Sequence, residues 1–197
     1  MSNNKVPQYD NELVEELASH IKSIIELLGE DPNREGLLKT PQRAAKALID
    51  NTSGYHSDAE RLIKQAIFSH DGKDMVIVKD IEFYSLCEHH ILPFFGTFTI
   101  GYIPDGEIVG LSKLARVVET YARRLQVQER LTKEVCDAVN THLKTKGVIA
   151  VCEAAHMCMK MRGIEKQQST TITMHYCGDF EDVQLQQRFF ALTQAKK

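Results

Sequence analysis

Apolar residues in the first quarter of the chain recur every three or four positions, which is the spacing of one face of an α-helix. The first run follows Asp10 or Asn11, either of which can cap a helix N-terminus, and it ends at Gly29. Thr40 followed by Pro41 predicts the start of a second helix, with Thr40 as its N-cap. The predicted apolar stripe of the first helix comprises Leu13, Leu17, Ile21, Ile24, Ile25 and Leu28.

From Met75 onward the pattern favours strands, because β-branched and aromatic residues become frequent and polar and apolar positions alternate. A turn at Pro104-Asp105-Gly106 ends one of these strands. The predicted strands are 75–78, 81–86, 96–103, 147–159 and 170–176. Helical spacing predicts three further helices, at 112–124, 127–144 and 181–195.

Strands that follow one another in pairs imply hairpins, so the order of elements predicts an α+β fold in which an antiparallel sheet carries helices on one face. We expect an N-terminal helical segment over residues 1–72 and a sheet-containing catalytic domain over residues 73–197. A sheet covered on one face leaves the other face free for a partner, which makes an oligomer plausible.

Composition narrows the class of protein. The chain has 197 residues, of which 43% are apolar and 26% charged, and these are the values of a folded globular domain. A net charge of −3 lacks the basic surplus of a nucleic-acid binder. Five cysteines, an odd and small number, favour a reducing compartment. Neither a signal peptide nor a membrane-spanning stretch is evident, so we expect a cytoplasmic protein.

The strongest chemical signal is Cys87-Glu-His-His90 between two predicted strands, together with His156-Met-Cys158 near the end of another strand. Alternation along that strand places His156 and Cys158 on one face. Two thiolates and one imidazole from Cys87, His90 and Cys158 suit Zn²⁺, and three ligands leave a position for water, as in catalytic sites. His89 and His156 are then candidate proton shuttles. His89 as a fourth ligand would instead give a closed, structural site. The other cysteines are expected in the core: Cys136, Cys152 and Cys177.

A second group of residues is basic. Ser112, two residues after Gly110, is the expected N-cap of a helix, and the free backbone N–H groups and nearby cations at this helix start favour an anion. Each basic residue alone is best explained as part of a solvated surface, but several near a metal site would suit a polyphosphate. They are Arg43, Lys46, Lys113, Arg116 and Arg162.

A third group is Gln126-Val-Gln128-Glu129, where a carboxylate could accept parallel hydrogen bonds from a ring N–H and an exocyclic amine, the edge that guanine presents. Taken alone, Glu129 reads as a surface helix residue.

Together these motifs resemble the GTP cyclohydrolase I family from about Glu12 to the C-terminal helix. The matching stretches are Thr40-Pro-Gln-Arg43, Cys87-Glu-His-His90, Gly110-Leu-Ser-Lys113, Gln126-Val-Gln-Glu-Arg-Leu131, Glu153-Ala-Ala-His-Met-Cys158 and Met161-Arg-Gly163. The resemblance implies a tunnelling fold (T-fold), in which sheets of several subunits form a barrel, and a homodecamer made of two pentamers with active sites between subunits. It implies hydrolysis and rearrangement of GTP to 7,8-dihydroneopterin triphosphate and formate, the first step of tetrahydrofolate and pterin biosynthesis.

The resemblance also implies a role for each matching residue. Cys87, His90 and Cys158 match zinc ligands. The residues that match catalytic groups are His89, His156 and Ser112. Glu129 matches the carboxylate that contacts the guanine, and Gln128 matches a substrate-binding position. The five basic residues named above match triphosphate contacts, and Arg43 and Lys46 would reach the triphosphate from a neighbouring subunit.

Two other functions remain as alternatives. A zinc deaminase would carry His-x-Glu followed by Pro-Cys-x-x-Cys, which this sequence lacks. A catalytically silent paralogue that acts as a scaffold would be expected to lose a zinc ligand or a histidine of the pair, and every one of these residues is present.

Overall fold

A computed structural model of the chain describes residues 9–194, and their contacts form two compact units divided between Thr52 and Ser53. The sequence placed this division twenty residues later, after residue 72. Residues 53–72 instead fold with the sheet, because α3 (Ala59–Lys64) packs on the helices of the sheet unit and β1 (Ile67–Ser69) pairs with one of its strands.

The first unit contains α1 (Asn11–Leu27) and α2 (Thr40–Asn51). Asp10 caps α1, its carboxylate accepting from two backbone N–H groups of the first turn, as predicted. The face that packs on α2 is centred on Val14 and Ala18, which are buried together with Ala45. Half of the predicted stripe therefore remains exposed, and Leu28 is 79% exposed.

The predicted N-cap of α2 is wrong by one residue. Thr40 is already the first helical residue, Lys39 holds the cap position, and no side chain caps the helix. The Thr40 hydroxyl donates instead to the carbonyl of Gly36 at 3.4 Å, and Pro41 follows in the first turn, where its missing N–H costs nothing.

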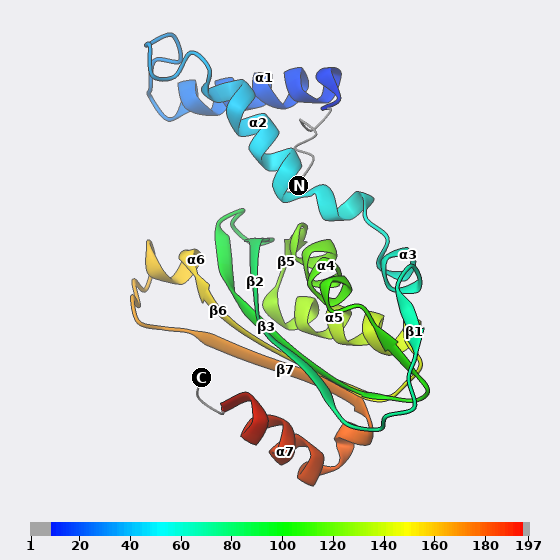
Figure 1. The fold of residues 1–197 in the computed structure, drawn as a ribbon. Helices are drawn as coiled ribbons and strands as arrows, with labels where there is room; N and C mark the ends of the chain where they lie inside the picture. The colour runs from blue at the N-terminus through cyan, green and yellow to red at the C-terminus, as the bar shows by residue number, and fades with distance from the viewer. Residues whose placement is uncertain (1–8, 195–197) are drawn as a thin grey trace. The chain divides into compact units, whose positions relative to one another are not determined.

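The second unit is built around the sheet (Figure 1). Its strands are β1, β2 (Val76–Cys87), β3 (Pro93–Pro104), β4 (Glu107–Val109), β5 (Leu125–Gln126), β6 (Thr145–His156) and β7 (Thr171–Gly178). Its helices are η1 (Ser53–His56), α3, α4 (Leu111–Ala122), α5 (Gln128–His142), α6 (Met157–Lys160), η2 (Asp179–Glu181) and α7 (Val183–Gln194). The predicted end of the last helix, Ala195, lies outside the described residues.

In the described part of the chain, five strands form the main sheet in the order β5-β2-β3-β6-β7, and all neighbours are antiparallel except β5, which runs parallel to β2. The two predicted stretches 75–78 and 81–86 form the single strand β2, which bulges between Val78 and Ile81 and places Asp80 at φ 60°. The α+β class with an antiparallel sheet is confirmed, and it is the arrangement expected of a T-fold subunit.

Helices α4 and α5 pack on one face of the sheet, where Phe83, Phe94 and Phe98 are buried against their apolar sides. Helix α7 packs on the opposite face, as Figure 1 shows. Phe189 of α7 lies so close to Gly101 that a Cβ there would meet its ring at 2.8 Å, so a larger residue at this position would force the ring or the strand to move. None of the helices within residues 9–194 is long and apolar enough to span a membrane.

Candidate metal centre and its pocket

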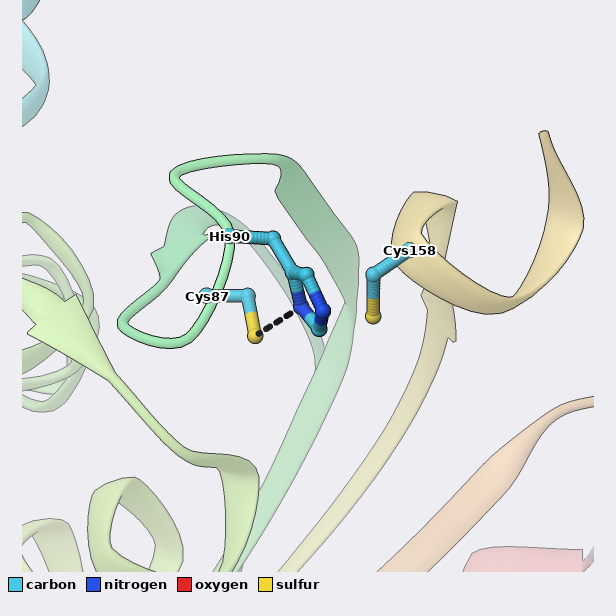
Figure 2. Close-up of side chains that lie close together, drawn as sticks. All are labelled: Cys87, His90 and Cys158. Atoms are coloured by element: carbon cyan, nitrogen blue, oxygen red, sulfur yellow. Dashed lines mark hydrogen bonds between the residues drawn. The ribbon is translucent and has the colours of Figure 1, made fainter. Parts of the chain in front are cut away.

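The tight turn after β2 brings two candidate ligands together. The backbone N–H of Cys87 donates to the carbonyl of Leu92 at 2.8 Å, and the N–H of Ile91 donates back to the carbonyl of Cys87 at 2.8 Å. Ile91 adopts a positive φ of 55° to close this turn. As a result Cys87 Sγ lies 3.8 Å from His90 Nδ1, the contact drawn dashed in Figure 2.

Cys158 reaches the same point from the end of β6. The sequence extended this strand to residue 159 and used its alternation to place Cys158, which is wrong because β6 ends at His156 and Cys158 lies in the helical turn α6. The pairing of β3 with β6, which sets Phe94 opposite His156, brings α6 next to the turn after β2. Figure 2 shows the Cys158 side chain directed toward Cys87 and His90.

The three ligand atoms of Cys87, His90 and Cys158 all lie within 4.8 Å of one another. Zn–S and Zn–N bonds of about 2.3 and 2.0 Å in tetrahedral geometry would hold such atoms about 3.5–3.8 Å apart, so the residues fit a zinc ion with small adjustments. Burial, and then the neighbouring Cys87 sulfur, raise the pKa of the Cys158 thiol. A cation between the sulfurs would reverse that effect, because thiolates are the form that binds metal.

His89 lies beside this group without belonging to it. Its Nδ1 is 3.9 Å from Cys87 Sγ, but its side chain is 65% exposed, and the set of mutually close ligand atoms found in residues 9–194 does not include it. The arrangement therefore favours three protein ligands and an open position over a closed, four-ligand site.

His156, the last residue of β6, stacks on the buried ring of Phe94, with centroids 4.7 Å apart and planes 2° from parallel. Its Nε2 lies 2.7 Å from Oε1 of Gln128. Burial lowers the pKa of His156, opposed by the charge of Glu129. The imidazole is thus held in one orientation and favoured in its neutral form.

The short strand β5 fixes the start of α5 beside the turn that carries Cys87 and His90. Cys87 pairs with Gln126, and the N–H of Glu88 donates to the Gln126 carbonyl at 3.0 Å. Arg130 of α5 bonds both the Glu88 carboxylate and, at 3.0 Å, the Gln126 side chain. The hydrogen bond from Arg130 lowers the pKa of Glu88, which favours the charged carboxylate in this ion pair.

These elements enclose a pocket of about 210 Å³. It is lined by Cys87, His89, His90, Gln126, Val127, Gln128, Glu129, His156, Cys158, Met159 and Thr171. Seven of these were predicted site residues. Gln126 and Val127 belong to a motif that the sequence analysis singled out, although no role was predicted for them, whereas Thr171 belongs to β7 and carried no sequence signal.

The basic residues lie elsewhere, and none of the pocket-lining residues is Lys or Arg. Lys113 donates to Gln65 at 3.4 Å, and Arg116 lines a separate cavity of about 240 Å³ near η1. Ser112 is the second residue of α4, whose N-cap is Gly110, so its predicted capping role is wrong. Arg162 follows α6, where its charge acts on Cys158. Arg43 and Lys46 belong to α2, in the other unit.

The remaining cysteines lie as expected. Cys136 and Cys152 are fully buried in the core, and Cys177 is half-buried against it. Burial raises the pKa of Cys152 to about 12.

The family model and the curated relatives indicate the same family. The family model described as GTP cyclohydrolase I matches residues 17–194. A protein of Bacteroides thetaiotaomicron named GTP cyclohydrolase 1 is 53% identical over 181 residues, which cover 92% of each chain. A Dictyostelium discoideum protein of the same name is 50% identical over 96% of this chain and 82% of its own. Among solved structures, an archaeosine synthase QueF-like protein aligns with 55% of this chain and 97% of its own, at 16% identity and a TM-score of 0.44.

Proposed function

Because this chain belongs to the GTP cyclohydrolase I family, we propose that it converts GTP and water to 7,8-dihydroneopterin triphosphate and formate at a zinc ion bound by Cys87, His90 and Cys158. The observation that carries the proposal is the convergence of these three ligand atoms beside a pocket that also contains His156 and Glu129. The product would enter tetrahydrofolate biosynthesis in the cytoplasm.

The bound zinc would supply a Lewis acid that lowers the pKa of a water molecule toward 7, which makes that water a nucleophile at neutral pH. His89 and His156 border the same pocket, so each can hold or deliver a proton at the purine imidazole as that ring opens. Phe94 keeps the His156 ring in one plane. Ser112 is assigned to the later ribose rearrangement by its family position alone.

Glu129 is the residue we assign to guanine recognition. It lies in the first turn of α5 and lines the pocket, one residue after Gln128. Its two carboxylate oxygens can accept hydrogen bonds from the ring N–H and the exocyclic amine of guanine at the same time. A carboxamide could not replace it, because only its oxygen accepts and its nitrogen donates. Adenine presents no such pair of donors, so this contact selects the base.

A triphosphate needs cations, and the pocket of a single copy has none in its lining. We therefore assign triphosphate binding to Arg162, near Cys158, and to basic residues of an adjacent copy of the chain in a homodecamer. Those residues are Arg43, Lys46, Lys113 and Arg116.

Metal content and turnover measured on the same preparations test the zinc assignment. Cys87→Ser and Cys158→Ser should lose both zinc and the fluorescent pterin formed from GTP, whereas the control Cys177→Ser, away from the pocket, should keep both. His89→Ala should keep zinc and lose turnover. Loss of zinc in that variant would make His89 a ligand, and zinc retention without any turnover in the unchanged protein would favour the scaffold.

A mixing experiment tests the shared site. Lys113→Ala and Cys158→Ser should each be inactive alone. If zinc and Lys113 act from different subunits, equal co-expression of the two variants should restore roughly one quarter of the activity, since one in four neighbour pairs is then intact. No recovery in assembled mixtures would place both residues in the same subunit's site.

A further inference from the structure

The carboxamide of Gln128 is oriented by its surroundings. This side chain is 1% exposed, and its Nε2 donates to the backbone carbonyls of Cys152 at 3.0 Å and Thr171 at 2.9 Å. Carbonyl oxygens only accept, so turning the amide over would press Oε1 against two other oxygens and leave buried groups unsatisfied. Oε1 must therefore point the other way, toward His156.

The neighbouring hydroxyls agree with this orientation. Thr132 donates its single hydroxyl proton to the backbone carbonyl of Gln128 at 2.8 Å. The 2.6 Å contact between Thr132 and Thr173 must then use the proton of Thr173. Thr173 Oγ1 consequently has only lone pairs to offer Gln128 Nε2, 3.1 Å away, so all three partners of Nε2 are acceptors.

This proton count determines the tautomer of His156. Gln128 Oε1 accepts only, and its contact at 2.7 Å is with His156 Nε2, so that nitrogen must carry the hydrogen. In the neutral ring the lone pair then lies on Nδ1. Within residues 9–194 the ring has no second hydrogen-bond partner, and the parallel stack on Phe94 holds its plane.

We propose that Gln128 is a positioning residue that holds His156 in the Nε2–H tautomer and so makes Nδ1 the proton-accepting atom of this imidazole. The role of His156 in proton transfer rests on the function proposed above. With both polar atoms of its amide engaged, Gln128 is not free to bind guanine, and this replaces the substrate contact expected from its sequence position.

A purely structural role for Gln128 is the competing explanation, because the same amide links α5 to β6 and β7. Loss of stability in a variant would fit both explanations. The tautomer itself separates them, since the two ring nitrogens give distinct ¹⁵N signals when protonated and when bare.

The experiment is solid-state ¹⁵N NMR of the full-length, zinc-loaded protein with labelled histidine and no GTP, at a pH where imidazoles are neutral. The His156 signals are those missing from His156→Gln. We expect Nε2–H alone in the unchanged protein, both tautomers in Gln128→Met, and Nε2–H again in Gln128→Glu, which keeps an acceptor oxygen. Thr173→Val, which removes one acceptor of Nε2 and leaves Oε1 in place, should also show Nε2–H.

Turnover provides a second measurement. Gln128→Met should lower kcat about a hundredfold, the lower end of what one acid–base group contributes, with KM for GTP nearly unchanged and zinc retained. Gln128→Glu should recover part of kcat even if it unfolds earlier.

Nδ1–H in the unchanged protein, or Nε2–H retained in Gln128→Met, would overturn the proposal. Because the tautomer is measured without GTP, an absence of turnover in the unchanged protein would contradict the proposed function and leave the tautomer result standing.

Discussion

Replacing Phe94 by leucine would remove two ring contacts from a fully buried position beside the proposed active site. One is the parallel stack on His156, with centroids 4.7 Å apart, and the other is an edge contact with Phe83 at 5.8 Å. Phe98 provides a matched control, because it is equally buried on the same strand and face, but among residues 9–194 its one ring contact is with Phe83, at 5.1 Å.

The expected loss of stability follows from these contacts. At about 0.5–1.5 kcal/mol for each ring pair, Phe94→Leu should lose about 1–3 kcal/mol and Phe98→Leu about 0.5–1.5 kcal/mol. A change of core shape adds up to about 1.5 kcal/mol to both. Urea unfolding followed by circular dichroism measures the two free energies.

Turnover should separate the variants more sharply than stability does. In Phe94→Leu the His156 ring can tilt out of its plane, and misplacement of a reacting group by about 1 Å costs on the order of a hundredfold in rate. We expect kcat to fall at least tenfold in Phe94→Leu, with zinc retained, and to stay within about twofold in Phe98→Leu. Equal losses of kcat in both variants at equal zinc content would refute the reasoning, since turnover would then follow core packing.

Three further predictions concern the scaffold. Gly96→Ala would set a Cβ 1.9 Å from the carbonyl oxygen of Glu153, so the urea midpoint of this variant should fall well below that of the control Gly106→Ala. In the control the Cβ meets nothing within 4 Å and only the positive φ is strained, so equal midpoints would contradict the prediction. Because burial raises the pKa of the Cys152 thiol from 9.0 to about 12, the unfolded chain loses that proton first, and the free energy of unfolding should fall as pH rises from 9 to 12. Cys152→Ala should lack this part of the decrease, and identical pH curves for the two proteins would contradict the assignment. Asp10→Ala should cost about 1 kcal/mol and speed hydrogen exchange at the start of α1, and unchanged exchange there would show that the cap contributes nothing.

Much of the fold could be predicted because the signals are local. Alternation located β3, and Pro104-Asp105-Gly106 marked the turn after β3, where Gly106 has the positive φ of 86° that the turn requires. Helical spacing located α4 and α5 within a few residues. The position of α7 on the opposite face was not predictable, because it depends on a long-range fit of Phe189 over Gly101.

Most residues of the candidate site could be predicted from the sequence, but their arrangement in space could be predicted only in part. The turn holding Cys87 and His90 is short, so local spacing sufficed to bring them together. The end of β6 at His156 was missed because Met157-Cys-Met-Lys160 contains neither Gly nor Pro to signal the change. The hydrogen bonds of Gln128 could not be predicted from sequence, since its partners Cys152 and Thr171 belong to strands brought beside it only by the tertiary fold.

The separation of the proposed zinc ligands along the chain has a consequence for the synthesis of the protein itself. Two of them lie in a single hairpin turn, whereas the third follows some seventy positions later, beyond α4 and α5. During translation the hairpin alone would bind an ion weakly through two ligands. Tight binding would require the third ligand, which is in place only after β6 has paired with β3. Metal uptake would then mark the completion of the sheet, and a nascent chain stalled before that strand would release its ion to a chelator that the finished protein resists.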